Sequence, residues 1–133
     1  MNVSVIIPCY NEQSVINDLL DALLNQSYPV DQMEIVIADG MSNDGTRDKI
    51  KKYSELHPEL AIRLVDNQKR TIPSALNTAI KAARGEFLVR LDAHSSPDRD
   101  YVARSVKALQ EGKGDNIGGV LRIKPSSKTL IAE

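Results

Sequence analysis

The stretch from residue 2 to residue 26, NVSVIIPCYNEQSVINDLLDALLNQ, changes its hydrophobic period just after Pro8, and this change decides the fold class. Residues 2–8 are rich in β-branched side chains, which is typical of a buried strand. Beyond the polar segment at 10–14, apolar side chains recur at the spacing of one helical stripe, at Val15, Ile16, Leu19, Leu20, Leu23 and Leu24. The stretch therefore predicts a strand followed directly by a helix.

The same unit repeats along the chain. Further strands are predicted at 34–39, 61–66, 86–92 and 116–124, and further helices at 46–57, 72–85 and 98–112. Strands that alternate with helices are joined by right-handed crossovers, which give a largely parallel sheet covered on both faces. We therefore expect an α/β fold in one domain over residues 1–133, with a mostly parallel sheet between two helical layers. In the helix at 72–85, Ile72 is expected to face inward.

Length, composition and charge exclude several classes. The chain has 133 residues, 41% of them hydrophobic, which is enough for a core, and its net charge is -1, with no basic stripe for a nucleic-acid partner. Its apolar runs are far shorter than the roughly 18 residues of a membrane span, and its N-terminus lacks the pattern of a secretory signal. Cys9, the single cysteine, excludes an internal disulfide. We therefore expect a cytoplasmic chain with no membrane span and no nucleic-acid partner.

In open parallel sheets, ligands bind outside the carboxyl ends of the strands. The polar side chains that follow the first four predicted strands should therefore converge. They are Tyr10, Asn11, Glu12, Asp39, Asp66, Asn67, Arg70, Asp92 and His94.

The segment VRLDAHSSP at 89–97 places Asp92 and His94 two positions apart at the end of a predicted strand. A strand directs residues i and i+2 to the same face, so the carboxylate and the imidazole could hold a metal together. Histidine is a ligand of zinc, manganese or iron. Equally, an aspartate after a strand is common in turns, and His-Ser-Ser-Pro alone is typical of a solvated loop.

Three other residues close to the ends of predicted strands are candidates for a structural or a functional role. Asp39 could form a turn, or its carboxylate could accept a hydrogen bond from a nucleobase N–H or a ribose hydroxyl. Asp44, just before a helix, is expected to form an N-cap or an Asx turn. Cys9, beside a strand end, could be a nucleophile, but no histidine is near it in sequence, and a small buried thiol is expected. Neither a G-x-x-x-x-G-K-[ST] phosphate loop nor a G-x-G-x-x-G turn is present.

Three blocks together, SVIIPCYNE (4–12), IVIADGMSNDGT (35–46) and NTAIKAARGEFLVRLDAHS (77–95), resemble the N-terminal half of inverting family 2 glycosyltransferases of the GT-A fold. The resemblance is close over about residues 3–97. The LDAHS form is similar to a subgroup linked to bacterial exopolysaccharide synthesis, including succinoglycan-type enzymes. The resemblance implies a GT-A, Rossmann-like three-layer α/β/α sandwich.

The resemblance also implies roles for individual residues. Pro8, Tyr10 and Glu12 match the motif that lines the nucleoside pocket, and Tyr10 is a candidate for stacking on the base. Asp39 matches the acid that recognises the nucleobase. Arg70 matches a basic residue near the nucleotide, but it could equally be an ordinary loop arginine with no role in binding.

Asp92 and His94 match the acids of the family's D-x-D motif, which contacts the ribose and a divalent cation. His94 replaces the second acid, so an imidazole stands where a carboxylate is usual. Because imidazole suits Mn²⁺ better than Mg²⁺, the expected cofactor is a divalent metal, with Mn²⁺ preferred.

The implied activity is transfer of a sugar from a nucleotide-diphosphate sugar, expected to be a UDP-sugar, to a saccharide or lipid-linked acceptor, with inversion. In the family the catalytic base follows the D-x-D segment, and it is expected beyond Glu133. The chain is therefore expected to be the donor-binding N-terminal part of a longer protein, inactive alone, with the full-length protein at the cytoplasmic face of the membrane. Association with further copies of the chain stays open.

Two alternatives remain at this point. A non-catalytic nucleotide-binding module would lack turnover. A sugar nucleotidyltransferase would carry a glycine-rich basic loop after its first strand, where this chain has PCYNE. A receiver domain is a more distant alternative, since it needs an acidic pair after the first strand.

Overall fold

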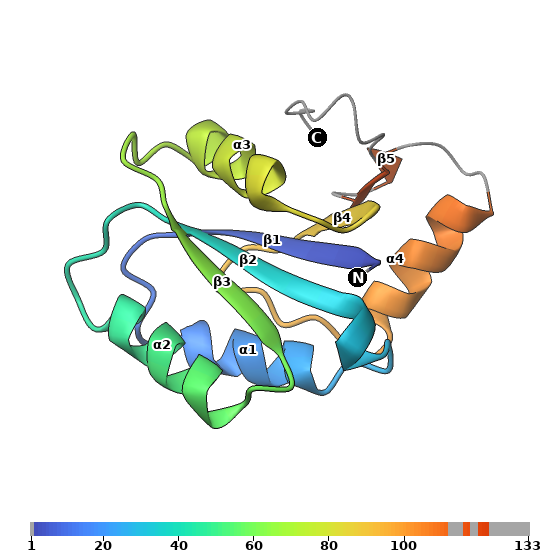
Figure 1. Ribbon diagram of the computed structural model, residues 1–133, viewed down its shortest axis with the longest axis horizontal. Coiled ribbons are helices and arrows are strands. Elements are labelled where there is room, and N and C mark those ends of the chain that lie inside the picture. Colours follow the sequence, from blue (N-terminus) through green and yellow to red (C-terminus); the bar gives the residue numbers. More distant parts are fainter. Residues whose placement is uncertain (1, 112–115, 118–119, 123–133) are drawn as a thin grey trace.

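The computed structural model describes residues 2–111, 116–117 and 120–122 of the chain (Figure 1). The elements follow the order β1 (Val3–Cys9), α1 (Ile16–Leu24), the short 3-10 helix η1 (Val30–Gln32), β2 (Met33–Asp39), α2 (Thr46–Leu56), β3 (Ala61–Asp66), α3 (Ile72–Ala82), β4 (Phe87–Arg90), α4 (Tyr101–Gln110), β5 (Asn116–Ile117) and β6 (Val120–Arg122). The predicted alternation of strands and helices is confirmed through α4.

The strands form one sheet in the order β3-β2-β1-β4-β6-β5. The pairs β1–β2, β1–β4 and β2–β3 are parallel, so the carboxyl ends of these four strands lie along one edge. The predicted α/β architecture with a mostly parallel sheet is therefore confirmed. Within the described part of the chain, no helix is both long enough and apolar enough to cross a bilayer.

The predicted single strand at 116–124 is wrong in its detail. Its described residues form two short strands, β5 and β6, which pair antiparallel with each other, and β6 also pairs antiparallel with β4. An antiparallel pair needs no crossover helix, and glycines weaken a strand where they interrupt it. The sequence has two at 118 and 119. Residues 118–119 and 123–124 of the predicted strand lie outside the described residues.

Helices cover both faces of the sheet, unequally (Figure 1). Side chains on one face of the strands share a core with α1, α2 and α4. In the described part of the chain, the opposite face packs on α3, through a smaller cluster in which Ala75, Ala79 and Ala83, the residue just after the helix, meet Ile6 and Val36. The three alanines let α3 approach the sheet closely. This three-layer arrangement places the start of α3 beside the carboxyl ends of β1 and β4.

At the other end of the sheet, buried Glu34 anchors the connection from α3 to β4. Its carboxylate accepts hydrogen bonds from Ser4 Oγ (2.5 Å), Arg63 Nη2 (2.7 Å) and the backbone N–H of Arg84 (2.6 Å). Burial alone would raise the pKa of Glu34, but these hydrogen bonds outweigh it and lower that pKa. A Cβ on Gly85 would lie 2.7 Å from Ser4 N, so only glycine fits where the connection crosses β1.

Candidate functional site

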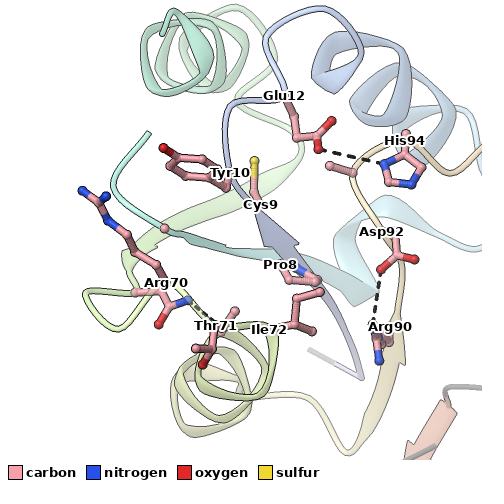
Figure 2. Close-up of a pocket in the computed structure, with 14 residues that line it drawn as sticks. Pro8, Cys9, Tyr10, Glu12, Arg70, Thr71, Ile72, Arg90, Asp92 and His94 are labelled. Carbon is pink, nitrogen blue, oxygen red and sulfur yellow. Dashed lines mark hydrogen bonds and ion pairs between the residues drawn. The ribbon is translucent and has the colours of Figure 1, made fainter. Parts of the chain in front are cut away.

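A pocket lies at the carboxyl ends of the parallel strands, against the first turn of α3 (Figure 2). It is lined by residues that follow β1, β2, β3 and β4, as the rule for open parallel sheets predicts. Six of the seven binding and metal residues named from the sequence line it, namely Pro8, Tyr10, Glu12, Arg70, Asp92 and His94. Asp39 is not among its lining residues.

Tyr10 and Arg70 form the side of the pocket next to β3. Tyr10 is 44% exposed, and the guanidinium carbon of Arg70 lies 5.9 Å from the centre of its ring. Arg70 has a positive φ of 62°, which costs a non-glycine residue on the order of 1 kcal/mol. An exposed aromatic face with a cation beside it is suited to a flat, electron-rich ring such as a nucleobase.

Asn67 contributes a buried polar group that was not assigned a role from the sequence. It is 3% exposed, and its Nδ2 donates to the carbonyl of Thr71 at 3.0 Å, which leaves Oδ1 as an acceptor. Among the described residues, Oδ1 has no hydrogen-bond partner. An unpaired buried acceptor costs about 1–3 kcal/mol. Because Asn67 lines the pocket, a ligand N–H or O–H could satisfy it.

The pocket also has an apolar wall. Ile72 was expected to face inward, but this is wrong: Ile72 is 56% exposed and lines the pocket together with Pro8 and Ala75. Thr71 caps α3, with its hydroxyl accepting from the backbone N–H of Ser74, so Ile72 stands on the first turn, ahead of the part of the helix that the sheet covers. The exposed apolar side chain gives a ligand a surface to bury.

Asp92 and His94 line the same pocket, but not through strand geometry. Strand β4 ends at Arg90, earlier than predicted, because the chain turns: Ser95 N donates to the carbonyl of Asp92, and Asp92 N donates to Ser95 Oγ. The two side chains therefore extend from a turn, with Ala93 buried between them. Asp92 Oδ1 lies 3.4 Å from Arg90 Nη2.

On the other side of this turn, His94 faces Glu12. Nδ1 of His94 lies 4.0 Å from Glu12 Oε1, and the imidazole is 71% exposed. Figure 2 shows His94 and Asp92 along the same rim of the pocket. In the described part of the chain, no three histidine, cysteine or acidic side chains are grouped closely enough to hold a metal ion. Asp92 and His94 are accessible oxygen and nitrogen donors, so they fit a cation that takes its other ligands from a bound anion.

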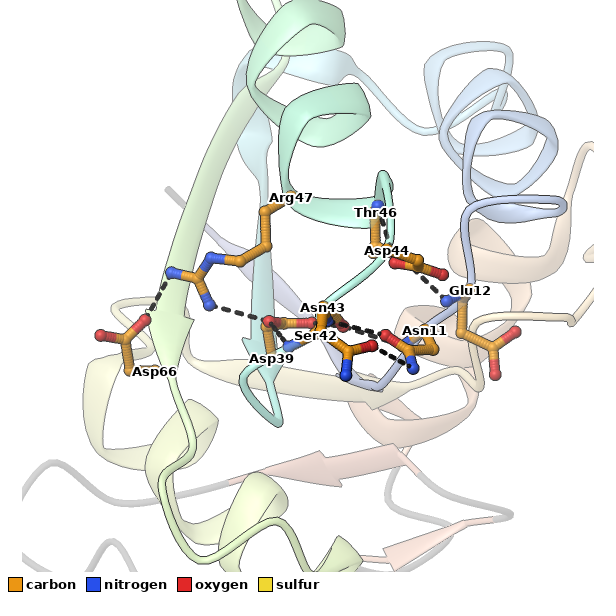
Figure 3. A network of polar contacts seen from close by, with 9 residues as sticks. All are labelled: Asn11, Glu12, Asp39, Ser42, Asn43, Asp44, Thr46, Arg47 and Asp66. Atoms are coloured by element: carbon orange, nitrogen blue, oxygen red, sulfur yellow. Dashed lines mark hydrogen bonds and ion pairs between the residues drawn. The ribbon is translucent and has the colours of Figure 1, made fainter.

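Asp39 lies beside the pocket in a separate polar network (Figure 3). It is fully buried, and its carboxylate accepts from Ser42 N (2.8 Å), Ser42 Oγ (2.5 Å) and Arg47 Nη1 (2.8 Å). Arg47 Nη2 also lies 2.6 Å from Asp66 Oδ1, so one guanidinium joins the ends of β2 and β3. Sequence reasoning missed Arg47, although an arginine at the start of α2 near two acids was a usable signal.

This network also fixes the loop after β1. Ser42 Oγ accepts the backbone N–H of Asn11 at 2.8 Å, and Thr46 Oγ1 accepts that of Glu12 at 2.9 Å. The predicted Asx turn is confirmed, since Asp44 Oδ1 accepts from Thr46 N at 2.9 Å. The loop carries Tyr10 and Glu12 into the pocket. The network therefore positions two lining residues, although Asp39 does not line the pocket.

Cys9 is buried as expected. Desolvation raises the pKa of its thiol to about 12, and the negative charges of Asp39, Glu12 and Asp44 contribute in the same direction. A thiol with so high a pKa carries almost no thiolate near neutral pH. Cys9 therefore belongs to the core and is not a nucleophile.

The chain matches a known family over nearly its whole length. The model of the family described as glycosyl transferase family 2 matches residues 4–131. A glucuronosyltransferase of Methanococcus voltae, named for a dolichyl N-acetylglucosaminyl phosphate, is 36% identical over 98% of this chain and 42% of its own length. The succinoglycan biosynthesis protein ExoA of Rhizobium meliloti is 37% identical over 81% of this chain and 33% of its own length. The expected likeness to succinoglycan-type proteins is confirmed.

Solved structures match as well. The mannosyltransferase PcManGT from Pyrobaculum calidifontis, in complex with GDP-Man and Mn²⁺, is 43% identical, with a TM-score of 0.77 over 81% of this chain and 32% of that one. Staphylococcus aureus TarS in complex with UDP is 27% identical, with a TM-score of 0.77 over 86% of this chain and 34% of that one. The chain thus spans less than half the length of these relatives and structures.

Proposed function

The chain belongs to glycosyl transferase family 2, and on that premise we propose that residues 1–133 form the donor-binding part of a glycosyltransferase. The reaction transfers a sugar from a nucleotide-diphosphate sugar, a UDP-sugar, to a saccharide or lipid-linked acceptor in polysaccharide or cell-surface glycan synthesis, with inversion. The observation that carries this proposal is the convergence of Pro8, Tyr10, Glu12, Arg70, Asp92 and His94 on one pocket at the strand ends.

The nucleoside occupies the side of the pocket formed by Tyr10, Arg70 and Asn67. The exposed Tyr10 ring offers a stacking surface, and Arg70 beside it adds a cation–π contribution. The unpaired Oδ1 of Asn67 accepts a hydrogen bond from the bound nucleoside, which removes the cost of its burial. Asp39, which the family motif links to the nucleobase, acts from behind the pocket, because its network holds the loop that carries Tyr10.

The diphosphate and a divalent cation occupy the side near Asp92 and His94. A divalent cation supplies charge that stabilises the leaving diphosphate as the glycosidic bond breaks. Asp92 contributes a carboxylate oxygen and His94 an imidazole nitrogen, a mixed donor set that favours Mn²⁺ over Mg²⁺. PcManGT in its complex with Mn²⁺ supports a divalent cation in this family.

The proposal covers the donor half of the reaction. The matched relatives are more than twice as long as the matched segment, which supports placing the acceptor's base and further acceptor contacts elsewhere in such proteins. The name of the Methanococcus voltae relative specifies a dolichyl-linked phosphate, which supports a lipid-linked acceptor. We place the chain in the cytoplasm, at the membrane's cytoplasmic face in its full-length form.

The test is a calorimetric titration of the chain with UDP, GDP and uridine. TarS is known with UDP and PcManGT with GDP-Man, so the two diphosphates are the informative competitors. We expect UDP to bind most tightly, and Tyr10→Ala to weaken UDP and uridine alike, since the ring contacts the nucleoside. Leu56→Ala is the matched control, because it removes another exposed apolar side chain, 69% exposed at the end of α2 and outside the pocket lining.

Tighter binding of GDP than of UDP would show that uracil is not the nucleobase of the donor, and it would leave the assignment of the pocket unchanged. Failure of the wild-type chain to bind either diphosphate would overturn the donor-binding proposal. A radiolabelled-donor assay with mixed acceptors tests whether the chain is only the donor-binding part or a complete enzyme. Rapid transfer by these 133 residues alone would contradict the placement of the acceptor's base elsewhere.

A further inference from the structure

Arg90 is a second pocket-lining arginine, to which the sequence motifs assign no role. It is the last residue of β4 and pairs in parallel register with Ile6 of β1. Leu88, two residues earlier, packs in the cluster under α3, and alternation along the strand puts Arg90 on that same face. Its side chain is 22% exposed and extends toward Asp92 on the rim of the pocket (Figure 2).

The contact between Arg90 and Asp92 is one that a ligand can replace. The 3.4 Å separation of Nη2 and Oδ1 is long for a charged hydrogen bond, and the Asp92 side chain is 51% exposed. Ion pairs of this kind contribute little to stability, because water competes for both partners. The backbone of Arg90 is fixed by comparison, since the next residue, Leu91, donates its N–H to the carbonyl of Ile6 at 3.1 Å.

The charges of the pocket give Arg90 a further reason to meet an anion. Arg70 and Arg90 bring two cations to the lining, and Glu12 and Asp92 bring two carboxylates. His94 adds an imidazole where the D-x-D pattern would add a third carboxylate. One carboxylate fewer therefore competes with a phosphate for the guanidinium of Arg90.

From this geometry we propose that Arg90 is a diphosphate-binding residue of the donor site, held by Asp92 when the site is empty and transferred to the phosphates when a donor binds. The proposal rests on the proposed function and adds a phosphate contact supplied by the strand itself. A guanidinium makes short, charge-assisted hydrogen bonds to phosphate oxygens. Asp92, released by the exchange, is then available to a cation. No covalent step is involved.

The first experiment compares a nucleoside diphosphate with its nucleoside. Wild type, Arg90→Gln and Arg90→Lys are titrated, in the presence of EDTA, with whichever of UDP and GDP binds wild type more tightly, and with the corresponding nucleoside. We expect Arg90→Gln to weaken diphosphate binding about tenfold or more, as loss of a charge-assisted contact does. Nucleoside affinity should not change, and Arg90→Lys should recover part of the diphosphate affinity.

The second experiment measures metal binding, which Arg90→Gln should strengthen although it weakens diphosphate binding. Mn²⁺ is titrated into the nucleotide-free chain, and its binding is followed by paramagnetic broadening of the Ala93 amide signal. Removing the Arg90 charge frees Asp92 and removes a nearby repulsion, so Arg90→Gln should bind Mn²⁺ about threefold more tightly or better. A variant that merely loosened the fold would weaken both ligands.

Arg104→Gln is the matched control. Arg104 forms an ion pair with Asp98 at 2.8 Å, both side chains are 61% exposed, and neither residue lines the pocket. It should change neither affinity. Unchanged diphosphate affinity in Arg90→Gln, or equal losses for diphosphate and nucleoside, would overturn the assignment of Arg90. Wild type that binds no nucleoside diphosphate would overturn the donor site itself, and the role of Arg90 with it.

Discussion

The guanidinium of Arg47 lies 2.8 Å from the carboxylate of Asp39, which is fully buried at the end of β2. The hydrogen bonds that Arg47 donates to Asp66 and Asp39 raise the pKa of Arg47, so its guanidinium stays charged at any physiological pH. This ion pair, and the two contacts that Ser42 makes to Asp39, hold the loop after β2 against the loop after β1. The wall of the pocket that carries Tyr10 therefore depends on a residue that does not line it.

Asp39→Ala should both destabilise the fold and weaken nucleotide binding. The substitution leaves Ser42 without its acceptor and Arg47 with Asp66 alone. Removing one partner of a buried charge pair costs about 3 kcal/mol. We expect that loss in urea denaturation. Calorimetry on the folded variant should show UDP affinity reduced about tenfold, because the loop that carries Tyr10 into the pocket is no longer held in place. Equal UDP affinity for wild type and variant would remove Asp39 from the donor site.

The sequence predicted the pocket because the parallel sheet dictates it. Alternation of strands and helices, read from hydrophobic periodicity, puts the ends of β1 to β4 on one edge, and the polar residues that follow these strands converge there. Tyr10, Arg70 and His94 lie in the pocket for that reason.

Periodicity does not predict contacts between loops. Arg47 binds Asp39 and Asp66 only because β2 and β3 are neighbours in the sheet. The turn at Asp92 depends on the Ser95 hydroxyl, which ends β4 at Arg90 although the apolar pattern continues to Leu91. In each case the deciding interaction is a hydrogen bond or ion pair made by a polar side chain, and hydrophobic spacing carries no information about it.

Glu34 should make part of the fold's stability depend on pH. Its carboxyl has a lowered pKa in the folded chain, so its contribution is fully present above the ordinary value of 4.5 and is lost as the pH falls through the folded value below it. Glu34→Gln should lower the free energy of unfolding by about 2 kcal/mol at neutral pH, since Arg63 loses its charged partner.

Thermal unfolding of wild type and Glu34→Gln between neutral and strongly acidic pH measures this. The difference in stability between wild type and Glu34→Gln should become smaller only below pH 4.5. A stability difference that stays constant down to strongly acidic pH would show that the charge of the Glu34 carboxylate does not stabilise the fold. Asp98, exposed on the surface and paired with Arg104, offers the comparison, and Asp98→Asn should leave stability almost unchanged.

Gly85→Ala should be much more costly than Gly45→Ala. A Cβ at Gly85 would meet backbone atoms of Val3 and Ser4 at 2.7 Å, and backbone inside a sheet cannot move aside. Such overpacking costs about 1–3 kcal/mol. At Gly45 the contact is Oε1 of Gln13, the end of a flexible side chain. Denaturation of the two variants gives the comparison, and equal stabilities would contradict the close crossing of β1 by the α3–β4 connection.

His94 should determine which cation the donor complex prefers. We expect the UDP complex of wild type to bind Mn²⁺ more tightly than Mg²⁺, because imidazole is a better ligand for Mn²⁺. His94→Ala should weaken Mn²⁺ by about tenfold or more, since even outer partners of metal ligands are worth that much. His94→Asp should move the preference toward Mg²⁺. Titration of both ions into the three UDP complexes measures this, and affinities unaffected by His94→Ala would make His94 an ordinary turn residue.

The most direct test of the donor pocket is a map of UDP binding on the chain by NMR. With 133 residues, the protein is small enough for backbone amide shifts to be assigned and followed through a UDP titration. We expect the largest shifts at residues 9–12, 40, 67–72 and 90–94, which surround the pocket, and no shift at the exposed end of α2 near Leu56. Saturable shifts centred on any other surface, with these segments unchanged, would contradict it.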